Sequence, residues 1–145
     1  MAQPLSAEIT RKIEESFAKQ GMMATLGAEI DQLALGQVRL VLPIANHVSQ
    51  QHGFAHAGAS FALGDSAAGY AALTLMPLEA EVLTVEMKIN LIAPAAGRRL
   101  IATGEVVKPG RRLLVTRATV AAEAEDGSLR DVALLQGTMI PAAPA

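Results

Sequence analysis

A single carboxylate stands in the most apolar segment of the chain. Asp65 is the only acidic residue between Asp31 and Glu79. An ionised carboxylate in apolar surroundings costs free energy unless it is paired or hydrogen-bonded. It either faces solvent, forms an internal hydrogen bond, or lies at a cleft where it can act as a base or a nucleophile. Because the helix predicted around Asp65 has no polar face, a cleft or an interface is at least as strong an interpretation as solvent exposure or an internal hydrogen bond.

The start of the same helix offers a second chemical group. Near Ala57 and Gly58 the first backbone N–H groups have no partner within the helix and carry the positive end of its dipole. Small side chains there let a carbonyl oxygen or an oxyanion come close to these N–H groups. Close packing of the helix would explain Ala and Gly equally well, so this feature alone does not distinguish a site from a packing contact.

The spacing of the two features restricts how they can work together. Ala57 and Asp65 are eight residues apart, which is about 12 Å along a helix. One carbonyl group cannot contact both. If both act on one reacting carbon, they come from two copies of the helix that lie antiparallel across a dimer interface.

Hydrophobic periodicity predicts the elements that hold these groups. A central helix is predicted at about 56–75, and its apolar residues on all sides predict burial on all sides. A shorter helix at about 6–20 has Ser6 as its N-cap and Gly21 as its end. The remaining predictions are a two-stranded hairpin within 25–44, four strands in a meander (84–91, 100–107, 113–123, 129–140) and a loose tail at 141–145. We therefore predict one α+β domain, 1–145, in which a single curved antiparallel sheet wraps around the long helix.

Composition excludes several classes of protein. The chain has 145 residues, of which 51% are hydrophobic, 18% charged and 3% aromatic, and the low charge predicts that another subunit covers part of its apolar surface. The lack of cysteine excludes disulfides, thiolate metal sites and cysteine nucleophiles. A net charge of −2, with no basic run longer than a pair, argues against a nucleic-acid partner.

Location and cofactors follow from similar observations. The N-terminus has no basic region followed by an apolar one, so no secretory signal is predicted. The segment 57–76 is nearly free of charge, but its Ala and Gly content and Asp65 favour a buried helix over a membrane span. We predict a cytoplasmic protein without a membrane partner. The three histidines are not grouped with carboxylates, so no metal and no cofactor are predicted.

The segment around the helix start carries a motif. A known family has Asn, then Gly, then His-Gly-Gly opening the central helix, then Asp seven residues after the last Gly; here the pattern is Gln50, Gly53, His56-Ala57-Gly58 and Asp65. The likeness continues through 84–94, Gly97 and 108–111. On these residues the chain resembles the hotdog-fold acyl-CoA thioesterases of the phenylacetate-pathway (PaaI-like) type over about 20–140. The resemblance implies a hotdog fold and hydrolysis of an acyl-CoA thioester to a free acid and CoA.

The resemblance also implies roles for individual residues. Asp65 would act as general base or nucleophile, and Thr84 would orient the attacking water. The backbone N–H of Ala57 would polarise the thioester carbonyl, with Gln50 beside it. Asp65 and Thr84 would come from one subunit. Ala57 and Gln50 would come from its neighbour. This arrangement requires at least a homodimer, and similar enzymes are commonly homotetramers.

The substrate-binding residues implied by the motif are Gly53, His56, Gly58, Phe61, Arg111 and Arg112. Either arginine could meet the CoA phosphates, or both could belong to an ordinary solvated turn. His56 is expected to support its loop by hydrogen bonding more than to transfer protons. Two departures from the motif, Ala57 for Gly and Gln50 for Asn, affect substrate preference and rate more than reaction type. The sequence does not identify the acyl group.

Two other functions are compatible with the same fold. A non-catalytic protein that binds acyl-CoA or an aromatic acid would bind its ligand without releasing CoA. A hydratase or dehydratase of this fold has a histidine a few residues after its aspartate. No histidine follows Asp65 anywhere in the chain, which argues against the second alternative.

Overall fold

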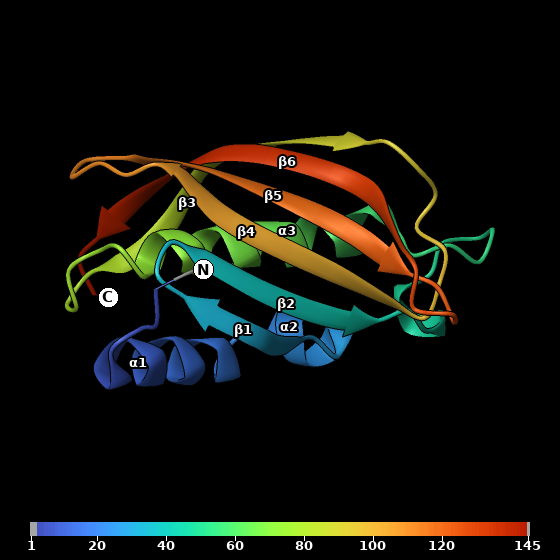
Figure 1. The fold of residues 1–145 in the computed structure, drawn as a ribbon, viewed down its shortest axis with the longest axis horizontal. Helices are drawn as coiled ribbons and strands as arrows, with labels where there is room; N and C mark the ends of the chain where they lie inside the picture. Colours follow the sequence, from blue (N-terminus) through green and yellow to red (C-terminus); the bar gives the residue numbers. More distant parts are fainter. Residues whose placement is uncertain (1–2, 145) are drawn as a thin grey trace.

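The computed structural model describes residues 3–144, which form a six-stranded antiparallel sheet with helices on its inner side (Figure 1). The strands are β1 (Glu29–Ala34), β2 (Gln37–Pro43), β3 (Glu81–Leu91), β4 (Arg99–Lys108), β5 (Leu114–Glu123) and β6 (Leu129–Ala142). Their order across the sheet is β1-β2-β4-β5-β6-β3. The predicted hotdog architecture, a curved antiparallel sheet around a long helix, is confirmed.

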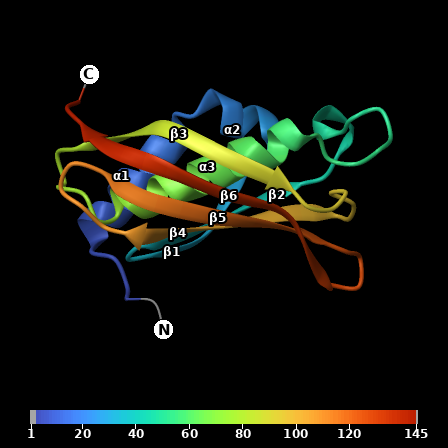
Figure 2. The ribbon, with the colours of Figure 1, turned by 90° about the horizontal axis from the view of Figure 1, so that it is seen from above.

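The partner of β3 differs from the prediction. A four-stranded meander would pair β3 with β4, but β3 pairs with β6, and β4 lies between β2 and β5. Only β4, β5 and β6 form a meander, and Figure 2 shows β3 beside β6. Hydrophobic alternation marks a strand but does not name its neighbour. Here the central helix separates β2 from β3 along the chain, so β3 joins the sheet at the edge far from β2.

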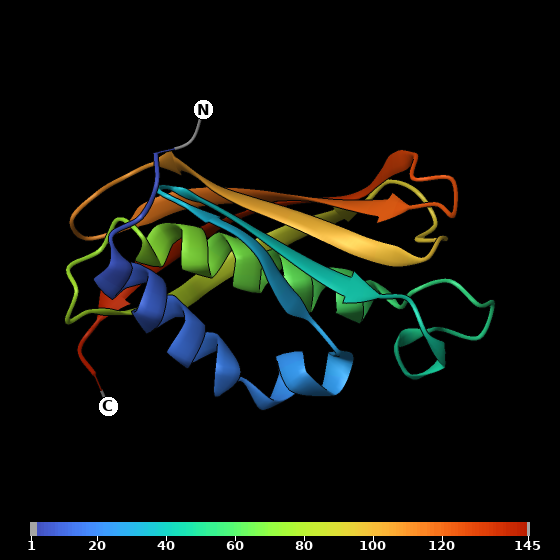
Figure 3. The same cartoon turned by 60° about the horizontal axis from the view of Figure 1, so that its bottom comes forward.

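The central helix α3 (Ala57–Leu73) lies along the inner face of the sheet (Figure 3). Its range falls within the predicted 56–75. Its small side chains let helix and sheet approach closely: a Cβ added at Gly104 of β4 would lie 2.3 Å from the carbonyl carbon of Ala67. Leu63, Ala67 and Ala71 are fully buried. The small side chains in the middle of α3 therefore allow its backbone to pack closely against β4.

The first half of α3 keeps an uncovered stripe, so the prediction of burial on all sides is wrong for the single chain. Gly58 is exposed, Phe61 is 36% exposed and Asp65 is half-buried. Residues three or four apart lie on one face of a helix. The sheet covers only the opposite side, and the N-terminal helix reaches only the second half of α3, where Ser16 and Tyr70 share a hydrogen bond of 3.1 Å.

The edge strand β3 also carries exposed apolar side chains. Leu83, Val85 and Leu91 are 55%, 56% and 58% exposed. The predicted regular alternation of this strand is broken by a bulge between Thr84 and Glu86. An edge of this kind offers unpaired backbone groups to another strand.

The N-terminal helix α1 (Ala7–Ala18) begins at the predicted cap, where the Ser6 hydroxyl accepts a hydrogen bond of 3.3 Å from the Ile9 N–H. Gly21 was expected only to end this helix. Instead it begins a second helix, α2 (Gly21–Leu26). The glycine ends one helix and starts the next because the chain turns between them.

A strand beginning at residue 25 was also predicted, and this prediction is wrong. Residues 21–26 are helical, and β1 begins only at Glu29. Met23 and Leu26, three residues apart, both face the core. Gly27 then ends α2 with φ of 79°, a conformation suited to glycine. This short helix was missed because its two buried residues span a single turn.

The remaining segments complete the description. A short 3₁₀ helix (Asn46–Val48) lies between β2 and α3. Pro141 and Ala142 belong to β6, so the predicted loose tail is wrong there, and residue 145 lies outside the described residues. In the described part of the chain, no helix is both long enough and apolar enough to cross a membrane.

Candidate active site

A cavity of about 580 Å³ lies at the start of α3. The loop before the helix, the first helical turn and the segment after β3 form its wall. Among the residues that line it are Gln50, Phe54, His56, Ala57, Ser60 and Ile92. Of the predicted site residues, the cavity thus contains Gln50, His56 and Ala57. Gly53 and Gly58 belong to the same loop and turn but do not line it.

The first turn of α3 leaves one backbone donor free. His56 is the N-cap, and its Nδ1 accepts a hydrogen bond of 2.8 Å from the Gly58 N–H. The Ala59 and Ser60 N–H groups donate to the His56 carbonyl oxygen, at 2.9 and 3.4 Å. Within residues 3–144 no acceptor is found for the Ala57 N–H. Because Ala57 lines the cavity, this free N–H is the donor available to a ligand.

The cap also defines the role of His56. A ring nitrogen that accepts a hydrogen bond carries no proton, so the neutral His56 ring holds its proton on Nε2. That nitrogen cannot then accept a proton from a substrate or a water. The predicted supporting role of His56 therefore agrees with the geometry, and the residue is not arranged as a general base.

Gln50 is held by its own loop. Its N–H donates to the Phe54 carbonyl oxygen (2.8 Å) and its carbonyl oxygen accepts from the Gly53 N–H (3.0 Å). Gly53 permits this turn because its φ is 84°. The Gln50 Oε1 accepts a hydrogen bond from the His52 N–H. With Oε1 engaged, the Nε2 amide group remains as a second hydrogen-bond donor on the cavity wall.

Asp65 lies in a different place. It lines a cavity of about 200 Å³ together with Thr84 of β3, and the Thr84 hydroxyl donates a hydrogen bond of 2.8 Å to Asp65 Oδ1. Burial raises the pKa of the Asp65 carboxyl above its ordinary value, while the bond from Thr84 lowers it in part. The raised pKa makes the Asp65 carboxylate a stronger base than an exposed aspartate.

The predicted site residues are therefore divided between two cavities of one chain. Gln50 and Ala57 line the first cavity, and Asp65 and Thr84 line the second. Ala57 and Asp65 are separated by two turns of the same rigid helix. As the spacing predicts, no single carbonyl group can reach both within one chain.

The other predicted substrate-binding residues lie elsewhere. Phe61 belongs to the uncovered stripe of α3. Arg111 and Arg112 are exposed and line a hollow of about 330 Å³ at the turn between β4 and β5. In the sheet, Leu114 pairs with Met139, which pairs with Thr84. The turn that carries the arginines therefore lies at the same end of the sheet as Thr84.

Sequence reasoning missed Ser60 as a cavity residue. Ser60 is only 1% exposed and lines the cavity at the helix start, three residues after Ala57. It also missed a polar group beside Asp65, where Gln20 and Ser16 of the N-terminal segment meet the Tyr70 hydroxyl at 2.8 and 3.1 Å. The spacing of three from Ala57 could have revealed Ser60 once the helix start was known. The contacts of Tyr70 depend on tertiary structure alone.

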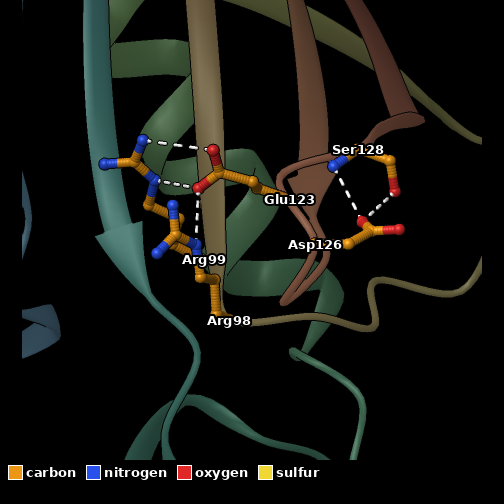
Figure 4. A network of polar contacts seen from close by, with 5 residues as sticks. All are labelled: Arg98, Arg99, Glu123, Asp126 and Ser128. Atoms are coloured by element: carbon orange, nitrogen blue, oxygen red, sulfur yellow. Dashed lines mark hydrogen bonds and ion pairs between the residues drawn. The ribbon is translucent and has the colours of Figure 1, made fainter.

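A second polar cluster lies away from both cavities (Figure 4). Arg98 Nε donates a hydrogen bond of 2.9 Å to Glu123, and Arg99 binds the same carboxylate. The two arginines, Arg99 first, hold the pKa of Glu123 below its ordinary value. The nearby hairpin turn is closed by Asp126, which accepts from the Ser128 N–H at 2.9 Å. These bonds tie β4 to β5 and stabilise the sheet.

No group of three metal-ligating side chains is found among residues 3–144. The polar groups of the two cavities are instead suited to acyl transfer, with N–H donors for an oxyanion and a carboxylate for proton transfer or attack.

Comparison with known proteins agrees with this chemistry. The family model described as the Thioesterase superfamily matches residues 52–127, which is just over half of the chain and includes the α3 residues that line both cavities. The chain belongs to the thioesterase superfamily. Membership of this superfamily indicates a hydrolase of the thioesterase class.

Three similar proteins extend the comparison. A thioesterase family protein from Silicibacter pomeroyi is 48% identical, with a TM-score of 0.90 over 94% of this chain and 99% of that chain. The 1,4-dihydroxy-2-naphthoyl-CoA hydrolase of Listeria monocytogenes is 27% identical over 72% of this chain and 85% of its own length. The E. coli PaaI protein, at 20% identity and a TM-score of 0.83 over 97% of this chain and 98% of that chain, shares the fold.

Proposed function

We propose that the protein hydrolyses an acyl-CoA thioester at a site built by two copies of the chain. The observation that carries the proposal is that two reactive groups of one helix, α3, lie at two different cavities. Its free Ala57 N–H faces one cavity, and Asp65, with its raised pKa, faces another. An N–H donor and a carboxylate that act on one carbonyl must then come from two antiparallel helices.

The exposed edge of β3 supports such pairing. Two β3 strands that join antiparallel would continue the sheet and bury Leu83, Val85 and Leu91. They would also place the uncovered stripe of one α3, with Phe61, against that of its partner. The two-fold axis makes the helices antiparallel, so Asp65 of one copy comes to face Ala57 of the other.

The reaction at this site proceeds by addition to the thioester carbonyl. The carbonyl oxygen accepts hydrogen bonds from the Ala57 N–H and the Gln50 amide, which stabilise the negative charge that develops on it. As a base, Asp65 takes a proton from water while the water oxygen bonds to the carbonyl carbon. The C–S bond then breaks, and the leaving thiolate receives that proton. As a nucleophile, the Asp65 carboxylate bonds to the carbonyl carbon, the C–S bond breaks and CoA leaves as a thiolate. Water then hydrolyses the mixed anhydride, which frees the acid and the Asp65 carboxylate, and the proton released from water goes to the thiolate.

The two cavities and the cationic turn suggest how the substrate lies. The cavity at the helix start is lined mainly by apolar residues such as Phe54, Leu91 and Val132, and it suits the acyl group. The turn between β4 and β5 carries Lys108, Arg111 and Arg112 and suits the CoA phosphates. This turn belongs to the copy that supplies Asp65. The CoA thioester named for the Listeria relative supports this class of substrate.

The test replaces Asp65 with Asn and follows release of free thiol from a panel of acyl-CoA substrates. Turnover of each accepted substrate is expected to fall by a factor of at least about 10³, while the mass in solution stays that of the wild type. Asp31→Asn is the matched control, since Asp31 is exposed on β1 and pairs with Arg39. Unchanged hydrolysis by Asp65→Asn would refute the mechanism. Binding of acyl-CoA by the wild type without thiol release would favour the non-catalytic alternative.

A further inference from the structure

The bulge in β3 lies beside the carboxylate of the proposed site. In a regular strand the side chains on one face are two residues apart. Val82 packs against the core and Thr84 bonds to Asp65, so even-numbered residues face the helix in this part of β3. Further along the strand, Met87 and Ile89 pack against the core. The inward face therefore changes from even-numbered to odd-numbered residues, and the bulge after Thr84 produces this change.

A strand without the bulge would present a different side chain to α3. If the pairing of Met87 with Gly137 continued regularly, Val85 would lie opposite Met139 and face inward, and Thr84 would face outward. Burial of an apolar side chain is favourable, so hydrophobicity alone favours this regular arrangement. The folded chain instead leaves Val85 56% exposed and turns Thr84 inward. The bulge therefore decides which of the two side chains reaches the proposed site.

Two neighbouring residues of β6 hold the bulge. A Cβ added at Gly137 would lie 2.5 Å from the Glu86 carbonyl oxygen and 2.8 Å from Met87 Sδ. Glycine inside a strand often marks a bulge or a close backbone approach, and here both occur together. The next residue, Thr138, donates a hydrogen bond of 3.0 Å from its hydroxyl to the Glu86 carboxylate. Both residues thus contact Glu86, with which the bulge ends.

We propose that Gly137 and Thr138 are positioning residues, which hold the bulge of β3 so that the bulge turns the Thr84 hydroxyl onto the Asp65 carboxylate. They act through Thr84, by fixing the backbone from which its hydroxyl points. This role rests on the proposed function, in which Asp65 is the general base or the nucleophile. The contact between Thr84 and Asp65 can nevertheless be measured without turnover.

The experiment follows the pKa of the Asp65 carboxyl by ¹³C NMR titration, in which Asp65→Asn identifies the resonance. Gly137→Ala is expected to remove the bulge and break the bond from Thr84. The pKa of Asp65 should rise, because that bond lowers it. Thr84→Val added to Gly137→Ala should raise the pKa no further, since the donor already points away. An unchanged pKa in folded Gly137→Ala would overturn the proposal.

A rescue variant separates positioning from a general loss of stability. Without the bulge residue 85 faces Asp65, so Val85→Thr in the Gly137→Ala background should return the pKa toward its wild-type value. Val85→Thr alone should leave the pKa unchanged. Gly104→Ala is the matched control, because it also sets a Cβ against backbone and should lower the Tm without moving the pKa. An equal rise in the control, or no rescue by Val85→Thr, would overturn the proposal.

Thr138→Val is a milder change for the case that Gly137→Ala does not fold. It keeps the shape of the side chain and removes the bond to Glu86. The pKa of Asp65 should shift in the same direction by a smaller amount, while Thr138→Ser should leave it in place. The other titratable groups that line the cavity of Asp65, Glu81 and Tyr70, are kept in every variant. If only Thr138→Val folds, an unmoved pKa overturns the proposal.

Failure of the proposed function gives a separate result. In an active enzyme the acid limb of the kcat/KM profile should move to higher pH in Gly137→Ala and return in the rescue variant. If the wild type hydrolyses no acyl-CoA, the same pKa changes still support the bulge as the device that aims Thr84, and only its catalytic use is refuted. If the wild type is active and the pKa moves while the limb does not, the positioning role in catalysis is overturned.

Discussion

Replacing Ala57 with proline removes a single chemical group from the proposed site, the backbone N–H that faces the thioester carbonyl. Ala57 is the first residue of α3, a position where proline is well tolerated because its N–H has no helical partner. The preceding residue, His56, has φ of −62° and ψ of 142°, which is the region that a residue before proline prefers. The substitution therefore fits the existing backbone.

The size of the effect follows from these contacts. Loss of one oxyanion donor lowers kcat by a factor of about 10²–10³, or about 2.7–4 kcal/mol. No hydrogen bond of the folded chain is lost, since none is formed by the Ala57 N–H in the described residues. Because proline restricts the unfolded chain, the Tm is expected to be unchanged or to rise by about 1–4 °C. The kcat is therefore expected to fall while the Tm stays the same or rises.

The assay is thiol release with a matched control and a mixed dimer. Ala57→Gly keeps the N–H, so it is expected to retain activity within a few-fold. A dimer of one Ala57→Pro chain and one Asp65→Asn chain, isolated with two different tags, holds one intact site and one site with both changes. It is expected to show about half the wild-type kcat per dimer, whereas each parent homodimer is nearly inactive. A mixed dimer no more active than its parents, or full activity of Ala57→Pro, would refute the shared site.

Three further perturbations have outcomes set by individual contacts. Thr84→Val removes the hydrogen bond that Thr84 donates to Asp65, and loss of this bond raises the pKa of the Asp65 carboxyl. The acid limb of the pH profile of kcat/KM should therefore move to higher pH, whereas Thr84→Ser keeps the donor and should leave the limb in place. An unmoved acid limb in the valine variant would contradict the role of Thr84. Gly104→Ala places a Cβ 2.3 Å from the carbonyl carbon of Ala67. The clash should destabilise the fold by about 3 kcal/mol and lower the Tm by roughly 6–12 °C in thermal melts. A Tm within about 2 °C of the wild type would argue against close packing of α3 on β4. Replacing Arg111 and Arg112 with alanine should raise KM for acyl-CoA about tenfold. KM for the matching acyl-pantetheine, which lacks the CoA phosphates, should stay unchanged. An equal rise in KM for both substrates would show that these arginines do not bind the phosphates.

Elements with a strong local signal were predictable from the sequence. The central helix, β4, β5 and β6 have long periodic patterns, and their observed bounds lie close to the predicted ones. The short helix α2 was missed because two buried residues on one turn do not make a period. The pairing of β3 with β6 was missed because side-chain alternation records which face of a strand is buried, and both candidate partners bury the same face.

The part of the candidate site that depends on spacing along one helix was also predictable from the sequence. The spacing of Ala57 and Asp65 already implied that one carbonyl group cannot contact both in one chain, because helix geometry is the same in every context. The structure adds that the two residues line different cavities. The tertiary structure adds the cap itself: the His56 ring accepts from the N–H of the second helical residue, Gly58, and the first N–H, of Ala57, stays free.

By itself the sequence determined what depends on neighbours along the chain: the helix that carries the carboxylate, the distance between its two reactive ends, and the family motif. Only the tertiary structure decided what depends on residues far apart in the chain. It set the contact of Thr84 with Asp65, the exposed edge of β3 and the burial of Ser60. The physical reason is that backbone geometry and hydrophobic period act over a few residues, whereas burial and hydrogen-bond partners are defined only once the sheet has closed around the helix.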